Sequence, residues 1–293
     1  MNLFGKRAEE KQKAKKSLKK EDIASEIEHE PVSIREKHRI IKPNEAREEK
    51  QFELLPIRVD AFDKLISSHG LERGSIVLIA GGAGTGKTTF CFQSIFESAL
   101  AGEKCIYLSF EEEPEKIKKH MKTNYGWDVA PLEKKGNFAI IKFDPLKVAK
   151  TVEAMLERQT GELMIEVAEL ELPFTPDRLV IDSLSALSVT FESEQKFRRY
   201  VKELFDMLES YNCVSFVISE TTQDPTVYSP QGIDEFLADV VLVFYNIKIR
   251  NKRMNAAEIL KIRSAKQVKG LIPYTIGEEG IKLLSSTSTD LEQ

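Results

Sequence analysis

The sequence predicts an α/β fold, with a mainly parallel sheet, helices on both faces and an antiparallel extension at the C-terminal end. Three observations predict it. Short apolar strands alternate with helical segments from about residue 75 to residue 245, and the last strands follow one another closely enough to form hairpins. A glycine-rich segment also separates a strongly apolar strand from a long helix, an arrangement typical of parallel sheets.

The predicted elements follow in order along the chain. Strands are expected over residues 75–80, 105–110, 138–143, 178–182, 213–219, 240–245 and 258–262. Helices are expected over residues 87–100, 114–124, 146–159 and 193–211, with a short helix over 59–66. Tyr274 and residues 281–284 belong to the antiparallel extension. No internal repeat is evident, so we expect one folded unit.

Composition divides the 293 residues into three parts. Residues 1–50 are rich in Lys and Glu and poor in aromatic residues, which predicts a flexible or loosely helical arm. Residues 51–285 form the predicted folded domain, and residues 286–293 a disordered tail. The net charge is −4, but residues 1–20 hold eight Lys or Arg against two Glu. This basic start could contact nucleic acid, an acidic partner or a lipid surface, or could simply be solvated.

Several classes of protein are disfavoured by what the sequence lacks. No run approaches 18 apolar residues, and the N-terminus has no apolar signal core, so we expect no membrane span, no secretion and a cytoplasmic location. The three cysteines, Cys91, Cys105 and Cys213, are widely spaced within apolar runs. This pattern predicts buried reduced thiols and neither a disulfide framework nor a zinc site.

The glycine-rich segment fits a phosphate-binding loop. Residues 81–88 read Gly-Gly-Ala-Gly-Thr-Gly-Lys-Thr and match the P-loop pattern G-x-x-x-x-G-K-[ST]. Backbone N–H groups of such a loop and the start of the following helix bind phosphates. Lys87 should reach the β- and γ-phosphates of ATP, and the Thr88 hydroxyl should bind Mg²⁺. The predicted nucleotide-binding residues are Gly82, Ala83, Gly84, Thr85, Gly86, Lys87, Thr88 and Thr89.

Carboxylates follow two other predicted strands. Asp182 ends the apolar strand over 178–182, where an Asp in P-loop proteins holds the water shell of Mg²⁺; it could instead cap the next element. Glu111 and Glu112 follow the strand over 105–110, and either could polarise the attacking water. Glu113, just before Pro114, is expected to serve the start of the next helix.

Two cations lie on a late strand. Strand alternation puts Lys261 and Arg263 on one face and Ile262 on the other. Two cations on one face could bind an anion, or could belong to a solvated edge strand, where Lys is common.

Taken together, these motifs resemble those of KaiC-type ATPases of the RecA superfamily, from about Phe52 to Leu284. The matching segments, in order, are 71–74, 81–88, 110–112, 180–184, 232–236 and 261–263. The resemblance implies a RecA-like P-loop core that uses ATP and Mg²⁺ and forms a homo-oligomeric, hexameric ring with ATP between subunits. It further implies that Glu111 and Glu112 polarise water, and that Lys261 and Arg263 reach the γ-phosphate of a neighbouring subunit.

The sequence also departs from the family pattern. The family often continues after Lys-x-Arg with Gly-Thr or Gly-Ser and then His, whereas residues 264–267 read Ser-Ala-Lys-Gln, which leaves the contacts to base and ribose open. Residues 234–239 carry no hydroxyl group where clock kinases carry phosphorylated Ser and Thr. The sequence therefore predicts no autophosphorylation of the clock type.

Three functions fit these motifs. The first is a Mg²⁺-dependent ATPase that acts as a regulatory or assembly switch on a protein partner, as in accessory ATPases of archaeal motility machinery. The second is a DNA-acting recombinase or helicase, but residues 220–235 contain no Lys or Arg for phosphate contacts in a central pore. Nucleic acid would then bind only through the basic N-terminal arm. The third is an ATP-binding assembly protein with little turnover.

Overall fold

A computed structural model of the chain describes residues 53–144, 172–191, 193–221 and 234–284. The predicted arm over residues 1–50, the predicted helix over 146–159 and the predicted tail over 286–293 lie outside the described residues. Within the described part of the chain, none of the helices is both long and apolar enough to cross a membrane.

The described residues form a nine-stranded sheet in the order β11-β10-β9-β8-β3-β7-β6-β4-β5. The six strands from β8 to β5 run parallel, while β9, β10 and β11 are antiparallel to their neighbours. This arrangement confirms the predicted fold class. The strands are β3 (Ile76–Gly81), β4 (Cys105–Ser109), β5 (Phe138–Lys142), β6 (Arg178–Asp182), β7 (Val214–Glu220), β8 (Val240–Ile249), β9 (Lys252–Ile262), β10 (Ile272–Gly277) and β11 (Gly280–Leu283). A separate ribbon pairs β1 (Leu54–Leu55) with β2 (Leu71–Glu72).

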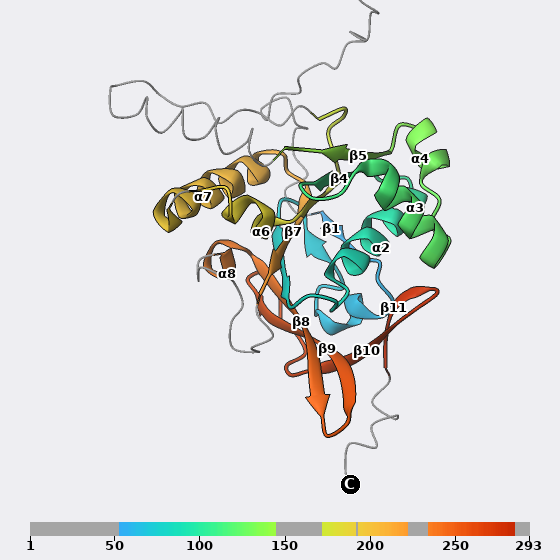
Figure 1. Cartoon of the computed structure of the whole chain (residues 1–293), viewed down its shortest axis with the longest axis vertical. Helices are drawn as coiled ribbons and strands as arrows, with labels where there is room; N and C mark the ends of the chain where they lie inside the picture. Colours follow the sequence, from blue (N-terminus) through green and yellow to red (C-terminus); the bar gives the residue numbers. More distant parts are fainter. Residues whose placement is uncertain (1–52, 145–171, 192, 222–233, 285–293) are drawn as a thin grey trace, which may run out of the picture. The chain divides into compact units, whose positions relative to one another are not determined.

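Helices cover both faces of the sheet (Figure 1). One face carries α2 (Lys87–Leu100), α3 (Pro114–Tyr125) and α4 (Ala130–Lys134), and the other carries α6 (Leu184–Ser188) and α7 (Glu194–Ser210). The remaining short helices are η2 (Phe62–Leu65) and α8 (Asp234–Leu237). The sequence missed the short α4, α6 and α8, overextended η2, and predicted β8 and β9 too short.

Strand β3 shows why both faces need cover. All six of its residues are buried. Val77 and Ile79 belong to the apolar cluster beneath α2, whereas Leu78 and Ala80 belong to the cluster beneath α7. Successive side chains of a strand point to opposite faces, so a strand buried on both sides reads as a continuous apolar run.

Trp127 is a packing anchor of the core. Its indole is buried and stacks on Tyr125, Phe92 and Phe96, with ring centroids 4.5, 6.1 and 5.9 Å away. The three thiols are also buried, as predicted. Burial raises the pKa of the Cys213 thiol to about 11, which keeps it protonated at neutral pH.

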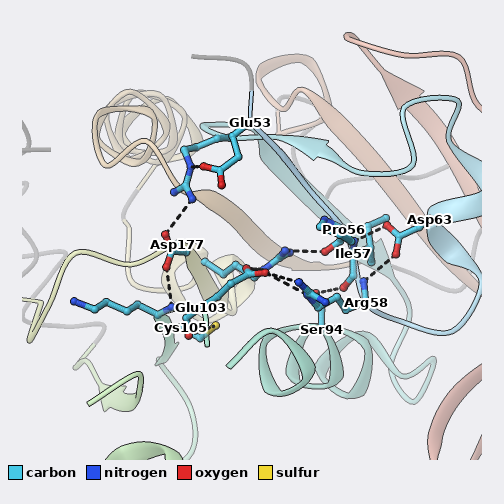
Figure 2. A network of polar contacts seen from close by, with 12 residues as sticks. Glu53, Pro56, Ile57, Arg58, Asp63, Ser94, Glu103, Cys105 and Asp177 are labelled. Carbon is cyan, nitrogen blue, oxygen red and sulfur yellow. Dashed lines mark hydrogen bonds and ion pairs between the residues drawn. The ribbon is translucent and has the colours of Figure 1, made fainter. Parts of the chain in front are cut away.

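Ion pairs connect the N-terminal ends of β4 and β6 (Figure 2). The Arg178 guanidinium is fully buried and donates from Nε to Glu103 (2.6 Å) and from Nη2 to the Pro56 carbonyl (2.7 Å). Glu103 also accepts from Arg58 at 3.0 Å. The network fixes the segment before η2 to the starts of β4 and β6.

Replacing Glu103 with glutamine removes the anion that faces the buried Arg178 guanidinium. Breaking one partner of a buried ion pair costs several kcal/mol, so we expect Glu103→Gln to lower the free energy of unfolding by about 3 kcal/mol in urea denaturation. The matched variant Glu115→Gln removes a carboxylate that is 84% exposed and pairs with Lys118 on the surface. It should leave the unfolding midpoint nearly unchanged, and equal losses in the two variants would contradict the role of the buried pair.

Candidate nucleotide-binding site

The carboxyl ends of four parallel strands meet at one edge of the sheet. Gly81 at the end of β3 lies opposite Glu220 at the end of β7, and Ser109 at the end of β4 lies opposite Asp182 at the end of β6. Ligands of open α/β sheets bind at this edge. Asp182 is the last residue of β6, and the other predicted site residues lie in the loops and helix starts that follow β3 and β4, namely Lys87, Thr88, Glu111 and Glu112.

The glycine-rich loop has the backbone that its sequence requires. Gly81 has a φ of 153°, and a Cβ there would lie 2.4 Å from the Phe244 carbonyl oxygen. Gly86, at the N-cap of α2, has a φ of 87°, and a Cβ there would lie 2.6 Å from the Ile276 side chain. Only glycine fits both positions. The buried Thr85 hydroxyl donates to the Gly82 carbonyl (2.9 Å) and closes the loop.

The remaining predicted loop residues line the same turn. Ala83 and Gly84 are exposed at its tip, whereas Thr89 is buried in the first turn of α2, with its hydroxyl 3.2 Å from that of Tyr125. The eight predicted residues therefore form one continuous cradle that ends in a helix N-terminus. A polyphosphate fits such a cradle because backbone N–H groups and the helix dipole favour anions.

Lys87 is a buried cation in this cradle. Its side chain is 5% exposed, and its Nζ donates to the Gly82 carbonyl (2.9 Å) and lies 3.8 Å from a Glu220 carboxylate oxygen. Burial lowers the pKa of Lys87, although the Glu220 carboxylate opposes this. A phosphate would provide the full counter-charge that a buried ammonium group needs.

Asp182 receives two hydroxyl groups on the same carboxylate oxygen. Thr88 Oγ1 donates to Asp182 Oδ2 at 3.0 Å, and the Tyr107 hydroxyl donates to the same atom. Burial raises the pKa of the Asp182 carboxyl, which the two hydrogen bonds oppose. A hydroxyl and a carboxylate are hard oxygen donors of the kind that Mg²⁺ prefers, and Mg²⁺ typically takes few protein ligands beside substrate phosphates and water. The donor set therefore fits Mg²⁺.

The three glutamates after β4 have different partners. Glu111 Oε1 accepts from the buried Ser183 hydroxyl at 3.0 Å, directly beside Asp182. Glu112 Oε1 accepts from Lys116 at 2.9 Å, and its other oxygen lies 3.8 Å from His120.

Glu113 lies at the start of α3, where it was expected. It occupies the N-cap position of α3, but no side-chain capping hydrogen bond forms there. Its carboxylate instead pairs with Lys142 at the end of β5. The tertiary ion pair replaces the local cap.

A cavity of about 280 Å³ opens beside the phosphate loop. It brings together residues from α2, α3 and the ends of β4, β6 and β7, and Glu220 faces it alongside the predicted residues. Its lining is Thr88, Thr89, Tyr107, Ser109, Glu111, Glu112, Ile117, His120, Met121, Asn124, Tyr125, Asp182 and Glu220.

Lys261 and Arg263 lie away from this cavity. The Lys261 ammonium group donates to the carbonyls of Glu235 (3.1 Å), Phe236 (3.2 Å) and Ala238 (2.6 Å), in and just after α8. Arg263 donates to the Phe236 carbonyl (2.9 Å) and pairs with Asp239 (3.0 Å). The two cations therefore share one side, as predicted. The Lys261 ammonium group is committed to this segment, whereas the Arg263 side chain is 53% exposed, so the solvated-strand alternative holds in part for Arg263.

Three polar residues of this edge were not identified from the sequence, namely Tyr107, Ser183 and Glu220. Ser183 and Glu220 stand next to the ends of predicted strands, whereas Tyr107 lies inside one. The strand-end position could have suggested Ser183 and Glu220, since it had already suggested Asp182. Tyr107 gave no such signal, because its hydroxyl reaches Asp182 from within an apolar strand.

Comparison with known proteins supports a single family. Residues 55–288 match the family model described as the KaiC ATPase. The circadian clock protein KaiC3 of Synechocystis sp. is 29% identical over 242 residues, which are 82% of this chain and 47% of that protein. The circadian clock oscillator protein KaiC of Synechococcus elongatus is 26% identical over 258 residues, 86% of this chain and 48% of that protein. The chain thus spans about half the length of these curated relatives.

A solved structure agrees with this match. The crystal structure of a KaiC-like protein from the hyperthermophilic archaeon Pyrococcus horikoshii has a TM-score of 0.66 and 27% sequence identity, and the match covers 80% of this chain and all of that one. Since the family model spans the whole described core, this chain belongs to the KaiC family of RecA-like ATPases, a family of ATP-binding and ATP-hydrolysing domains.

Proposed function

We propose that this chain binds and hydrolyses ATP with Mg²⁺, using Gly82–Thr89 for the phosphates and Thr88 with Asp182 for the metal. The contact between Thr88 Oγ1 and Asp182 Oδ2 (3.0 Å) carries the proposal, because it joins the phosphate loop to the end of β6 through two oxygen ligands suited to Mg²⁺. When bound, Mg²⁺ supplies charge neutralisation at the phosphates. Lys87 adds a fixed positive charge beside them.

Glu111 is the better candidate for the catalytic base. The Ser183 hydroxyl holds its carboxylate next to Asp182, and that carboxylate lines the cavity. A carboxylate in this place can accept a proton from water as the water oxygen attacks the terminal phosphorus and the bond to ADP breaks. The Glu112 carboxylate, by contrast, pairs with Lys116 on the surface of α3. The ion pair with Lys116 suits a role for Glu112 in orienting the segment before α3 better than a role in proton transfer.

We expect Glu111→Gln to lower kcat by about 10²- to 10⁴-fold, the usual contribution of a general base, while the dissociation constant for ATP changes little. Glu112→Gln should lower kcat by about tenfold or less, because an exposed ion pair contributes little. Phosphate release and calorimetric ATP binding measure the two effects. Glu113→Gln, which breaks only the Lys142 pair, is the matched control. A larger loss of kcat for Glu112→Gln than for Glu111→Gln would contradict this assignment.

We further propose that Lys261 and Arg263 act across a subunit interface in a ring, with the six copies that the family resemblance implies. The backbone N–H of Arg263 donates to the Asp239 carbonyl. The Asp239 carboxylate in turn accepts from the backbone N–H of Ile76, at the start of β3. Gly81, at the other end of β3, is five residues away, or about 16 Å along the strand. This separation favours contact with a nucleotide on a neighbouring copy, as a head-to-tail ring would provide.

Mixing two inactive variants tests this arrangement. Lys87→Ala removes the phosphate-binding cation, and Arg263→Ala removes the proposed trans-acting cation. In equimolar mixed rings, about a quarter of the interfaces combine an intact phosphate loop with an intact Arg263, so ATPase activity should partly return. Each variant alone, taken through the same mixing procedure, is the control. Mixed rings, verified by differential tagging, that regain no activity would contradict the trans role and leave Lys261 and Arg263 as supports of α8.

The biological role that fits best is a regulatory or assembly switch on a protein partner, driven by the nucleotide state. Direct turnover separates this ATPase from an assembly protein that binds ATP with little hydrolysis. Stimulation of turnover by DNA would instead favour the recombinase or helicase alternative.

A further inference from the structure

We propose that Tyr107 is a positioning residue that orients the Asp182 carboxylate for Mg²⁺. This inference rests on the proposed function, since it deepens the role of the same metal site. The Tyr107 hydroxyl donates to Asp182 Oδ2, the oxygen that also accepts from Thr88. Tyr107 comes from β4, a different strand from the one that carries Asp182.

The sheet register explains how the two residues meet. Tyr107 lies opposite Val180, and Ser109 lies opposite Asp182, so Tyr107 and Asp182 are diagonal neighbours on adjacent strands. Diagonal positions lie within reach of an aromatic side chain. A shorter side chain at position 107 would not reach the carboxylate.

The Tyr107 ring is held in place by the core. It is 1% exposed, and its centroid lies 5.6 Å from that of Phe92 in α2. A buried tyrosine hydroxyl requires a partner at the end of its apolar ring, and here the partner is the metal-site carboxylate. Because the ring cannot move freely, the position of its hydroxyl is fixed before any ligand arrives.

Two donors on one oxygen determine how the carboxylate can act. The terminal torsion of an Asp side chain is broad, so an unrestrained carboxylate rotates readily. A carboxylate oxygen has two lone pairs, and the Thr88 and Tyr107 hydroxyls together fill those of Oδ2. A metal-bound water would then approach Asp182 through Oδ1. Of the two donors, only Tyr107 has no other expected task, since Thr88 is also a proposed metal ligand.

A purely structural role is the alternative, with the Asp182 carboxylate serving only to satisfy a buried hydroxyl. The two roles differ in one measurable way. Residues that orient metal ligands typically change metal affinity by 10- to 100-fold when substituted, whereas a structural hydroxyl affects only stability.

The experiment compares two tyrosine-to-phenylalanine variants of the full chain. Tyr107→Phe removes the hydroxyl that reaches Asp182. Tyr274→Phe is the matched control, because Tyr274 is equally buried and donates its hydroxyl to the Thr85 carbonyl in the phosphate loop. Both variants keep the packed ring, and thermal unfolding of each confirms that it is folded. Binding of a non-hydrolysable ATP analogue is then measured by calorimetry at increasing Mg²⁺ concentration and in EDTA.

For Tyr107→Phe, we expect the Mg²⁺ concentration that gives half-maximal analogue binding to rise about tenfold or more, with affinity in EDTA within about twofold of wild type. Tyr274→Phe should change binding equally with and without Mg²⁺, and so leave the half-maximal Mg²⁺ concentration unchanged. An unshifted Mg²⁺ requirement in Tyr107→Phe, or an equal shift in both variants, would overturn the role of Tyr107 alone. If binding of the analogue to the wild-type protein does not depend on the Mg²⁺ concentration, the proposed metal site itself is overturned.

A double-mutant cycle with Asp182→Asn tests whether Tyr107 acts through this carboxylate. If it does, adding Tyr107→Phe to Asp182→Asn produces no further change in the Mg²⁺ requirement. A full additional shift in the double variant would overturn the proposal, because Tyr107 would then act by another route.

Discussion

The parallel register of β3, β7, β6 and β4 is the constraint on which the site depends. It sets the ends of these strands in one row, so Gly81 meets Glu220 and Ser109 meets Asp182. A parallel sheet must be covered on both faces, which is why these strands are mainly apolar along their length. The carboxylates of the site, Asp182 and Glu220, therefore stand at the strand ends, on one edge of the sheet. A shift of one residue in any of these strands would turn its side chains to the opposite face and disperse the site.

The two edges of the sheet handle charge differently. At the N-terminal edge, the buried Arg178 guanidinium meets the Glu103 carboxylate at 2.6 Å, and Arg73 meets Asp177 at 3.0 Å. At the C-terminal edge, burial disfavours the charged forms of both Lys87 and Asp182, and the nearest carboxylate to Lys87 is 3.8 Å away. Burial of charge without close pairing is costly, and it commonly marks sites that await a ligand. The charges at the N-terminal edge are thus neutralised by ion pairs within the chain. Under the proposed function, phosphate and metal would neutralise the charges at the C-terminal edge.

Much of the fold followed from local patterns. The helix over 87–100 and the strand over 178–182 have the predicted bounds because their apolar periods and flanking residues agree. Short helices such as α6 and α8 were missed, because four or five residues are too few to show a helical period in the sequence. The phosphate loop and Asp182 were predictable because the glycine spacing and the ends of apolar strands can be recognised in the sequence itself. Tyr107 was not, because its role depends on the diagonal neighbour that only the sheet order supplies. The ion pair of Glu113 was not predictable for the same reason, since its partner Lys142 lies on another strand.

The contacts of Lys261 and Arg263 indicate different roles for the two cations within the proposed ring. Lys261 directs its three possible donors to three carbonyls around α8, so it is committed to holding that helix in place. Arg263 has a planar group with five donors, and its side chain is 53% exposed despite its bonds to Phe236 and Asp239. Donors therefore remain for an incoming phosphate, which a guanidinium group can bind in bidentate fashion. Lys261 can still contribute its charge from a distance, but Arg263 is the cation whose geometry suits direct contact. Lys261 and Arg263 both bind the segment around α8. A nucleotide on a neighbouring copy that binds Arg263 would therefore also affect the position of α8. In this way the nucleotide state of one copy could change the conformation of the next.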